Sequence, residues 1–485
     1  MEMCIPFISI LLQTGEPNTP AYTFWLIFLL HIFGLLFSLH ALMRSHSPQG
    51  TIAWMLALNL LPGISIPLYL ALGAERIRRH TEERLPANAV ASMLRGIREH
   101  MLHTTPGSIG RTLTGLSGIP PCNGNNVSLL RDGADTYMAL ANAIRSAKHS
   151  ILIEFFIIRN DLVGNGFRKL LEEKARNGVS VYLIYDEIGS HKLPHGYLKK
   201  LKKAGVHPAS FNGRRFWWSS FLRINYRNHR KLVIIDSSAA YLGSLNVGLE
   251  YVKTPGKTYW RDTFVRLDGP IVAQCLLSFA EDWQRATGND ISHLAHSQSA
   301  QGRYCCQLIP SGPDDFPQNG WQLTLLEMAA RARKRLWLAS PYFVPDTAVY
   351  AALLAAARRG VQVRILIPRK GDSAMANLAL LTYLPELAHT GIRILAYKPG
   401  FLHEKIALSD DDVCCIGTAN LDERSLRLNF ELTLLMEDSD MTERIRKLLA
   451  DDMAQAEEQL PEQWYETPFY MRAAARICRL LSPIL

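Results

Sequence analysis

One short pattern of residues occurs twice in this chain, and its duplication constrains the fold more than any other feature. Both copies read H-x-K-x4-D, with the fixed positions held by His229, Lys231 and Asp236 and by His403, Lys405 and Asp410. At the same distance after each copy comes a glycine turn, which carries Ser244 and Asn246 in the first copy and Thr418 and Asn420 in the second. Agreement at so many positions predicts one half-site that is present in two structural repeats.

The segments around the two motifs predict the same order of strands and helices. A run of apolar residues at 151–158 is typical of a buried strand, and a helical pattern over 167–177 and a second strand over 179–185 follow it. The corresponding segments of the second half are 336–343, 347–359 and 361–367. A third strand begins after Gly205 and after Gly391. We expect two α/β repeats, each a mixed, mostly parallel sheet flanked by helices, with the histidine motifs on strands at a shared cleft.

The duplicated His-Lys pair is suited to chemistry on a phosphodiester. Such a substrate resists attack because it is anionic and its alkoxide leaving group is poor. Two pairs supply an imidazole nucleophile that forms a phosphohistidine, a second imidazole that donates a proton, and two ammonium groups for the non-bridging oxygens. On a strand, the His and Lys of H-x-K share one face. The same parity puts Asp236 and Asp410 on the other face, so we assign these motif residues a supporting, hydrogen-bonding role.

Other residues near the motifs are candidates for supporting roles. Those of the two glycine turns are suited to bind phosphate oxygens or to brace the lysines: Ser244, Asn246, Thr418 and Asn420. A histidine nucleophile also needs an acid that fixes its tautomer. Asp262 and Glu431 lie at corresponding places downstream of the two motifs and are the candidates. The eight cysteines show no zinc-like spacing, and we expect neither a metal nor a cofactor.

The N-terminal part predicts a transmembrane hairpin. Residues 22–43 carry no charged side chain, and a helix of that length covers about 33 Å, enough to cross a bilayer core. A second uncharged segment, 51–72, contains Pro62-Gly63 and Pro67, breaks that membrane helices tolerate when their neighbours satisfy the backbone. The two segments therefore predict a pair of membrane helices.

The distribution of basic residues predicts the orientation of this hairpin. Residues 1–21 contain no Lys or Arg, the connection contains Arg44, and four arginines occur within 76–84. Because basic residues favour the cytoplasmic side and two spans return the chain to its starting side, we expect the C-terminal part at the cytoplasmic face. The net charge of +9 favours an anionic membrane surface or another phosphate-bearing partner.

These features divide the chain into six segments. They are an N-terminal segment (1–21), the hairpin (22–72), a basic linker (73–126), the first repeat (127–295), the second repeat (296–460) and an amphipathic tail (461–485). The segment 214–221, RRFWWSSF, is typical of a membrane-surface loop. In the tail, three arginines at helical spacing predict an amphipathic helix, although a helix that packs against a partner fits the pattern equally well.

The motif residues give the chain a recognisable family resemblance. The duplicated H-x-K-x4-D with its G-[GST]-x-N turn resembles the phospholipase D superfamily over roughly residues 127–440. Within it, the chain is similar to membrane-anchored bacterial cardiolipin synthases, through the paired apolar segments and through 185–190, 340–345 and 417–425. One departure is Phe156, where relatives often carry a tyrosine.

The resemblance implies phosphatidyl transfer at the bacterial inner membrane without nucleotide or metal. One phosphatidylglycerol would donate its phosphatidyl group to a histidine, with His229 favoured, and a second phosphatidylglycerol would accept the group to give cardiolipin. Three alternatives stay open: a phospholipase D that uses water, a phosphatidyltransferase that uses phosphatidylethanolamine, and a membrane-tethered nuclease or nucleic-acid binder. Because the basic residues form no concentrated stripe, no nucleic-acid partner is expected. The oligomeric state stays open.

Overall fold

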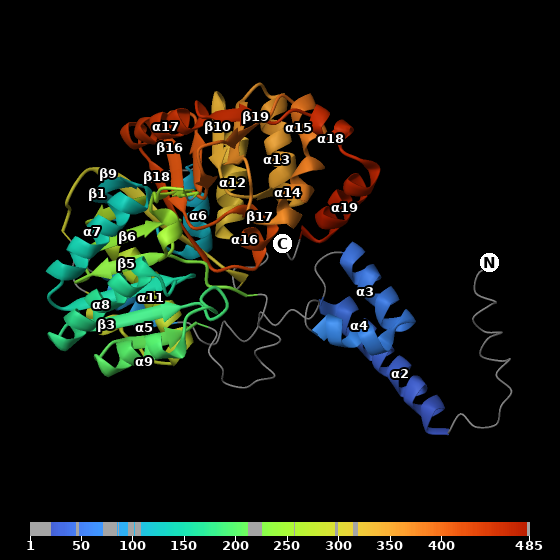
Figure 1. Cartoon of the computed structure of the whole chain (residues 1–485), viewed down its shortest axis with the longest axis horizontal. Helices are drawn as coiled ribbons and strands as arrows, with labels where there is room; N and C mark the ends of the chain where they lie inside the picture. Colours follow the sequence, from blue (N-terminus) through green and yellow to red (C-terminus); the bar gives the residue numbers. More distant parts are fainter. Residues whose placement is uncertain are drawn as a thin grey trace. The chain divides into compact units, whose positions relative to one another are not determined.

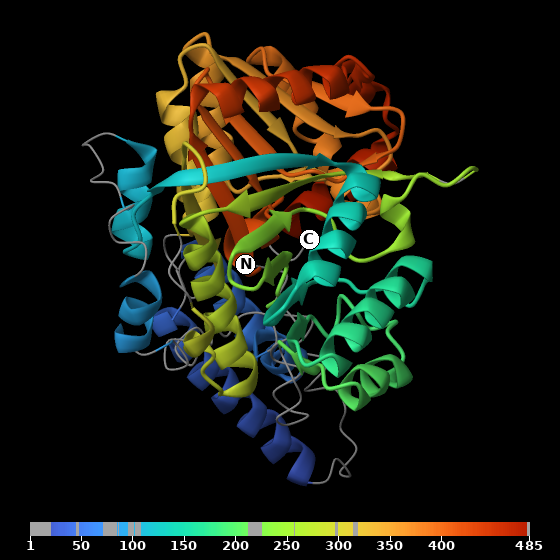
Figure 2. The same ribbon diagram turned by 90° about the vertical axis from the view of Figure 1, so that its left-hand side faces the viewer.

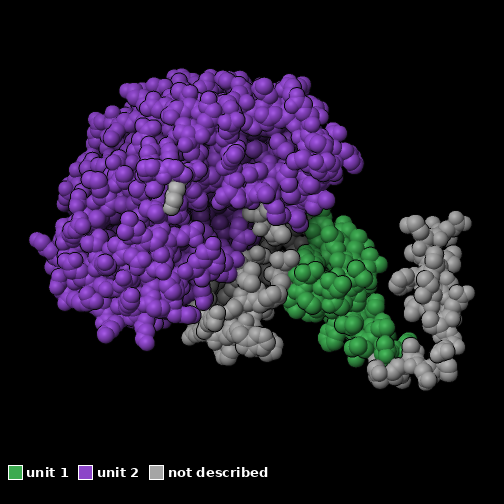
Figure 3. All heavy atoms as spheres, in the orientation of Figure 1, with its two compact units in different colours: residues 1–77, 216–222 green, residues 78–215, 223–485 purple. Residues whose placement is uncertain are grey.

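Figure 1 shows the computed structural model, which describes residues 21–44, 48–70, 85, 87–95, 101, 108–211, 226–256, 258–295, 299–313 and 319–482. The chain forms two compact units (Figure 3). Unit 1 comprises residues 1–77 and 216–222, and unit 2 comprises residues 78–215 and 223–485. The predicted membrane-surface loop at 214–221 lies outside the described residues.

Unit 1 contains the helices α2 (Ala21–Arg44), α3 (Pro48–Leu60) and α4 (Pro62–Leu68). Within the described residues, only α2 contains a segment, Thr23–Met43, that is long and apolar enough to cross a membrane, with a mean hydropathy of 2.2. The prediction of one helix over 51–72 is wrong, because Leu61 leaves the helical conformation with φ −137° and ψ 60°. Pro62 then begins α4, because a proline at the first position of a helix loses no backbone hydrogen bond and has a backbone angle suited to that position.

Unit 2 is built around a 15-stranded sheet. The strands that belong to the first half are β1 (Cys122–Arg131), β2 (Ser150–Phe155), β3 (Ser180–Tyr185), β4 (His207–Ser210), β5 (Leu232–Ile235), β6 (Ala239–Gly243) and β8 (Thr263–Asp268). Those of the second half are β9 (Tyr304–Ser311), β10 (Arg335–Ala339), β12 (Gln362–Pro368), β13 (Arg393–Tyr397), β15 (Ile406–Ser409), β16 (Val413–Gly417), β18 (Glu431–Glu437) and β19 (Ala456–Glu458). Four two-residue strands lie outside this sheet: β7 (Trp260–Arg261), β11 (Phe343–Val344), β14 (Phe401–Leu402) and β17 (Leu421–Asp422).

The two halves have the same strand order, and the sheet continues from one half to the other where β1 pairs with β9. In Figure 2, β1 is the long teal strand that runs between the two halves. The order is β4-β3-β2-β5-β6-β8-β1 in one half and β13-β12-β10-β15-β16-β18-β9 in the other, where β19 adds an edge. The mixed α/β fold is as predicted, but a mostly parallel sheet is not. Among the strands of this large sheet, only β2-β3-β4 and β10-β12-β13 pair in parallel. The reason is that short turns join β5 to β6 and β15 to β16, and such turns permit only antiparallel pairing.

Helices cover the sheet of unit 2 and make its central strands fully buried. They are α5 (Ala87–Arg95), α6 (Ile109–Ser117), α7 (Asp132–Ser146), α8 (Leu162–Arg176), α9 (His195–Lys203), α11 (Ile271–Thr287), α12 (Gly320–Arg331), α13 (Thr347–Arg358), α14 (Ala374–Leu381), α15 (Leu384–His389), α16 (Glu423–Arg427), α17 (Ser439–Met453), α18 (Glu462–Glu466) and α19 (Phe469–Leu480). Every residue of β2, β5, β15 and β16 is buried, which explains their continuous apolar sequences. β1 begins at Cys122, inside the predicted linker.

Candidate active site

The His and Lys of each motif lie just before β5 and β15 rather than on them, so the predicted placement of these residues on strands is wrong. The physical reason is that their backbone bonds to the opposite repeat. The His229 N–H donates to the Phe430 carbonyl at 2.9 Å, and the His403 N–H donates to the Arg261 carbonyl at 2.8 Å. The short strands β7 and β14 pair in parallel beside the second contact. Each histidine is thereby held next to a residue that immediately precedes a buried carboxylate.

Those carboxylates bind the histidines across the repeat boundary. His229 Nδ1 lies 2.9 Å from both carboxylate oxygens of Glu431, and His403 Nδ1 lies 2.8 Å from Asp262 Oδ2. A proton on Nδ1 satisfies each contact and leaves the Nε2 lone pair for chemistry. The sequence pointed to both carboxylates, but not to this exchange, in which each repeat orients the histidine of the other.

The hydroxyls of the glycine turns donate hydrogen bonds to these carboxylates. Within the described part of the chain they do not contact a lysine or point to a free phosphate-binding position, as the sequence had suggested. Thr418 Oγ1 donates to Glu431 at 2.5 Å, and Ser244 Oγ donates to Asp262. Burial opposes ionisation of both acids, but their bonded histidines and the nearby lysines outweigh it and hold the pKa of Asp262 and of Glu431 below the usual range. Each histidine therefore has an ionised partner.

The turn asparagines have different partners. Asn246 Oδ1 accepts the Ile157 N–H at 3.0 Å, and its Nδ2 donates to the Tyr251 hydroxyl at 2.9 Å. Asn420 Nδ2 donates to Asp422 at 3.0 Å, while its buried Oδ1 has no hydrogen-bond partner among the residues that the structure describes. Asn246 thus fixes the loop around Tyr251, whose ring lies 5.7 Å from that of His403.

Four basic groups converge in the site under strong desolvation. Lys231 and Lys405 are 0% and 3% exposed, and each Nζ donates to the carbonyl of its own motif histidine at 2.5 Å. Burial lowers the pKa of Lys231 to about 7 and that of Lys405 to about 8. Burial also lowers the pKa of His229 to about 4 and that of His403 to about 3. An anion bound among these groups would reverse the shifts, so the site is built to receive negative charge.

Comparison with known proteins agrees with this geometry. Residues 140–283 and 325–453 match the family described as "Cardiolipin synthase, PLD-like domain". The chain belongs to this family. Proteins named Cardiolipin synthase A from Pseudomonas putida (strain W619) and Pseudomonas entomophila (strain L48) are each 39% identical to it over 478 residues, which cover 96% of this chain and 99% of theirs.

A solved structure shares the fold. The crystal structure of phosphatidylserine synthase from Haemophilus influenzae Rd KW20 superposes with a TM-score of 0.60, at 13% identity, over 78% of this chain and all of the other. At that identity the match shows the fold alone. With the apolar helix α2, membership of the cardiolipin synthase family makes this a membrane-associated protein.

The motif aspartates lie at the far ends of β5 and β15, away from the histidines. Asp236 accepts the backbone N–H groups of Lys148, His149 and Ser150 at 2.7 to 2.9 Å. Asp410 does the same at the start of β10, for the N–H groups of Arg333, Lys334 and Arg335. Both have positive φ, 50° and 51°, so a turn rather than strand parity sets their direction. In this chain the motif aspartates tie neighbouring strands together.

We expect Asp410→Ala to lower stability more than catalysis. The substitution removes charge-assisted hydrogen bonds worth about 1–3 kcal/mol. It also places an alanine at positive φ, a conformation that Asp and Asn tolerate better because their side chains form local hydrogen bonds. Asp410→Asn keeps one acceptor oxygen and tolerates this conformation, so it should lose less. Urea unfolding compares the two, with kcat measured per folded molecule. A kcat loss in Asp410→Ala as large as that of a histidine variant would contradict the structural role.

Aromatic rings and buried ion pairs around the site were not found from the sequence. The Phe156 ring lies 4.9 Å from that of His229, and the Trp260 ring lies 4.9 Å from that of His403. The residues between His and Lys point away from the site: Arg230 pairs with Asp282, and Arg261 links Glu404 to a further carboxylate, Asp452. Position was the available signal, since Phe156 lies within the strand predicted at 151–158 and Trp260 is close to Asp262.

Proposed function

We propose that the chain is a cardiolipin synthase that transfers the phosphatidyl group of one phosphatidylglycerol to a second, releasing glycerol. The observation that carries this proposal is the convergence of two histidine, carboxylate and lysine sets in one buried site, since phosphatidyl transfer needs a nucleophile and an acid on opposite sides of phosphorus. Relatives named Cardiolipin synthase A over nearly the whole chain support the choice of product.

In the first half-reaction, His229 Nε2 attacks phosphorus. The phosphorus–nitrogen bond forms as the phosphorus–oxygen bond to glycerol breaks, and His403 gives its proton to the departing oxygen. Both imidazoles are neutral in the free enzyme, but the bound phosphodiester adds negative charge that favours a protonated His403. Lys231 and Lys405 hold the non-bridging oxygens. The choice of His229 as the nucleophile rests on the resemblance to relatives in which the first motif supplies it.

The second half-reaction reverses these roles. The terminal hydroxyl of another phosphatidylglycerol attacks phosphorus while His403 takes its proton, and the bond to His229 breaks. Water in place of this alcohol would give phosphatidic acid instead. Since His229 and His403 are only 8% and 6% exposed, the site favours an acceptor that displaces water.

Purified full-length protein in vesicles of labelled phosphatidylglycerol tests the proposal. We expect cardiolipin and glycerol to form in equal amounts. Phosphatidic acid without cardiolipin would overturn the synthase in favour of a phospholipase D. With phosphatidylethanolamine also present, release of ethanolamine would instead identify that lipid as the donor.

We also propose that the catalytic unit faces the cytoplasm and that the chain crosses the membrane once. Contacts within unit 1 support a single crossing. A β-carbon at Gly34 would lie 2.3 Å from the Leu58 carbonyl oxygen and 3.4 Å from Pro62, so the junction of α3 and α4 lies beside Gly34. Tyr69, just after α4, bonds with its hydroxyl to His40 Nδ1 at 2.8 Å. Helix α3 therefore runs back along α2 as far as Gly34, and α4 then reverses direction and ends beside His40.

The depth of this return agrees with the distribution of charge. Gly34 precedes Arg44 by about 15 Å along the helix, close to the middle of a bilayer core of about 30 Å. A re-entrant α3–α4 pair puts Arg44 and the arginines of 76–84 on one side, and residues 1–21, without Lys or Arg, on the other. That separation follows the positive-inside rule, whereas two full spans would put Arg44 outside and the uncharged N-terminal side inside.

Labelling by a membrane-impermeant maleimide, assigned to individual cysteines by peptide mapping, tests the number of crossings. We expect Cys4 to react in intact spheroplasts, whereas a cysteine introduced at Ser45 in a Cys4→Ser background should react only in inverted vesicles. The two-span hairpin predicts the reverse for both positions. Gly34→Leu, which fills the contact with Leu58, should expose more of the α3–α4 pair to proteolysis than Gly63→Leu, where no neighbouring atom lies within 4 Å.

A further inference from the structure

The C-terminal helix α19, itself part of unit 2, packs against the rest of that unit with the side that carries Ala475 and Cys478. Ala475 and Cys478 are buried, and Cys478 packs in a small apolar cluster with Ala376 and Ala379 of α14. This contact fixes the helix through small residues. The larger apolar residues of α19 are therefore not required for docking.

Those larger residues form an exposed apolar stripe. Phe469, Tyr470, Ile477 and Leu480 are 78%, 72%, 58% and 81% exposed. At about 100° per residue they fall within one side of the helix, distinct from the side of Ala475 and Cys478. A stripe of this kind on a helix already held by its opposite side indicates a surface that contacts another apolar phase.

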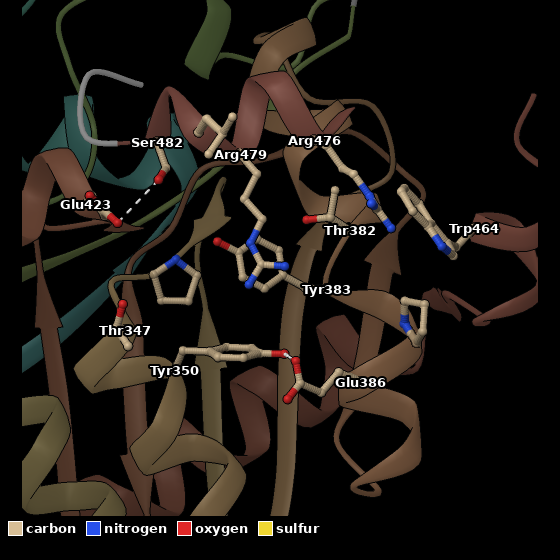
Figure 4. A pocket seen from close by; sticks show the side chains of 13 residues that line it. Thr347, Tyr350, Thr382, Tyr383, Glu386, Glu423, Trp464, Arg476, Arg479 and Ser482 are labelled. Carbon is tan, nitrogen blue, oxygen red and sulfur yellow. Dashed lines mark hydrogen bonds between the residues drawn. The ribbon is translucent and has the colours of Figure 1, made fainter. Parts of the chain in front are cut away.

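Between the stripe and the buried side, α19 presents two arginines to a pocket in repeat 2. Figure 4 shows Arg476 and Arg479 beside Tyr383, Thr382 and Trp464. The pocket measures about 730 Å³, and none of the motif histidines or lysines lines it. It is thus a site separate from the catalytic one.

The arginines are oriented by aromatic rings rather than by carboxylates. The Arg479 guanidinium lies 4.1 Å above the Tyr383 ring, and that of Arg476 lies 6.0 Å from the Trp464 ring. In the part of the chain that the structure describes, neither forms an ion pair with Asp or Glu. The two pocket carboxylates have other partners, since Glu386 accepts from the Tyr350 hydroxyl at 2.8 Å and Glu423 from Ser482 at 3.3 Å. Guanidinium edges held in this way are suited to a phosphate.

We propose that α19 lies in the membrane interface with its apolar stripe among the acyl chains, and that Arg476 and Arg479 bind the phosphate of an anionic phospholipid in the pocket. An apolar stripe beside arginines is the composition of interfacial helices. The membrane helix α2 tethers the same chain to a bilayer, so a lipid rather than a soluble anion is the occupant. The proposal extends the proposed function, because it gives the synthase a lipid site outside its catalytic centre.

The test uses the full chain in vesicles, with Leu480→Cys carrying a fluorophore in a Cys4→Ser, Cys305→Ser background. Brominated acyl chains should quench the fluorophore when phosphatidylglycerol is present. Arg476→Gln with Arg479→Gln should reduce that quenching at least about twofold, to the level of vesicles without anionic lipid. Arg472→Gln removes one positive charge from the same helix, as each of the two pocket substitutions does alone, but Arg472 does not line the pocket, so this variant should leave the quenching in place.

Absence of quenching in all vesicles would overturn the proposal, and so would equal quenching with and without the two arginines. Restoration of quenching in zwitterionic vesicles by inorganic phosphate alone would show that a free anion, not a lipid headgroup, occupies the pocket. The measurement also works in a His229→Ala protein, because it does not depend on turnover. Its failure is therefore distinguishable from failure of the synthase activity.

Discussion

His229→Ala and His403→Ala should each lower cardiolipin formation on the order of 10⁴-fold or more. One variant lacks the nucleophile and the other lacks the proton donor. Because the two histidines act as a unit, removal of either one abolishes nearly all of the rate enhancement that they provide together. The double variant should therefore be little worse than either single one. Initial rates with labelled phosphatidylglycerol in vesicles measure all three.

The matched control is His195→Ala, which removes an exposed histidine at the start of α9. It should leave the rate within about twofold of the unmodified protein, the range expected for a surface substitution that touches nothing in the site. Circular dichroism spectra should show that all variants are folded. A His403→Ala protein that keeps a tenth or more of the activity would contradict the paired half-sites.

Asp262→Asn and Glu431→Gln should each lower kcat by about 10²- to 10⁴-fold, because an amide no longer stabilises the Nδ1-protonated imidazole and its positive charge. The two variants should then differ according to the exchange of partners between repeats. Glu431 supports His229, and Asp262 supports His403. A substrate whose leaving group needs no proton separates these roles.

Phosphatidyl p-nitrophenol is such a substrate. Asp262→Asn and His403→Ala should still release a burst of nitrophenol, because the nucleophile and its carboxylate are intact. Glu431→Gln and His229→Ala should show no burst. If each carboxylate instead served the histidine of its own repeat, the burst would persist in Glu431→Gln and be lost in Asp262→Asn.

Local features of the fold were predictable from the sequence, but the pairing between repeats was not. Apolar runs and helical spacing located β2, α8 and β3 and their counterparts β10, α13 and β12 to within a few residues. Partner exchange depends on the parallel contact of β7 with β14 and on the Asn228–Phe430 bridge, which join distant segments. No spacing within one motif reports such contacts, so Asp262 and Glu431 were found without their partners.

The errors have similar origins. The His and Lys of H-x-K were expected on strands, yet the N–H groups of both histidines bond to the other repeat. The apolar segment at 51–72 was expected to form one span because membrane helices tolerate proline breaks, but α3 ends at Leu60 and a separate helix begins at Pro62. In both cases the local sequence predicted which residues are apolar and buried or membrane-embedded, but it did not predict the backbone conformation.

The central claim is that phosphatidyl transfer passes through a histidine of one repeat that is oriented by the carboxylate of the other. Rapid acid-free quenching of the enzyme with radiolabelled phosphatidyl p-nitrophenol, followed by peptide mapping, tests it most directly. In Asp262→Asn, label should accumulate on His229 as an acid-labile phosphoramidate, because the second half-reaction lacks its supported base. Label on His403, or no protein-bound label in a variant that still releases nitrophenol, would contradict the account.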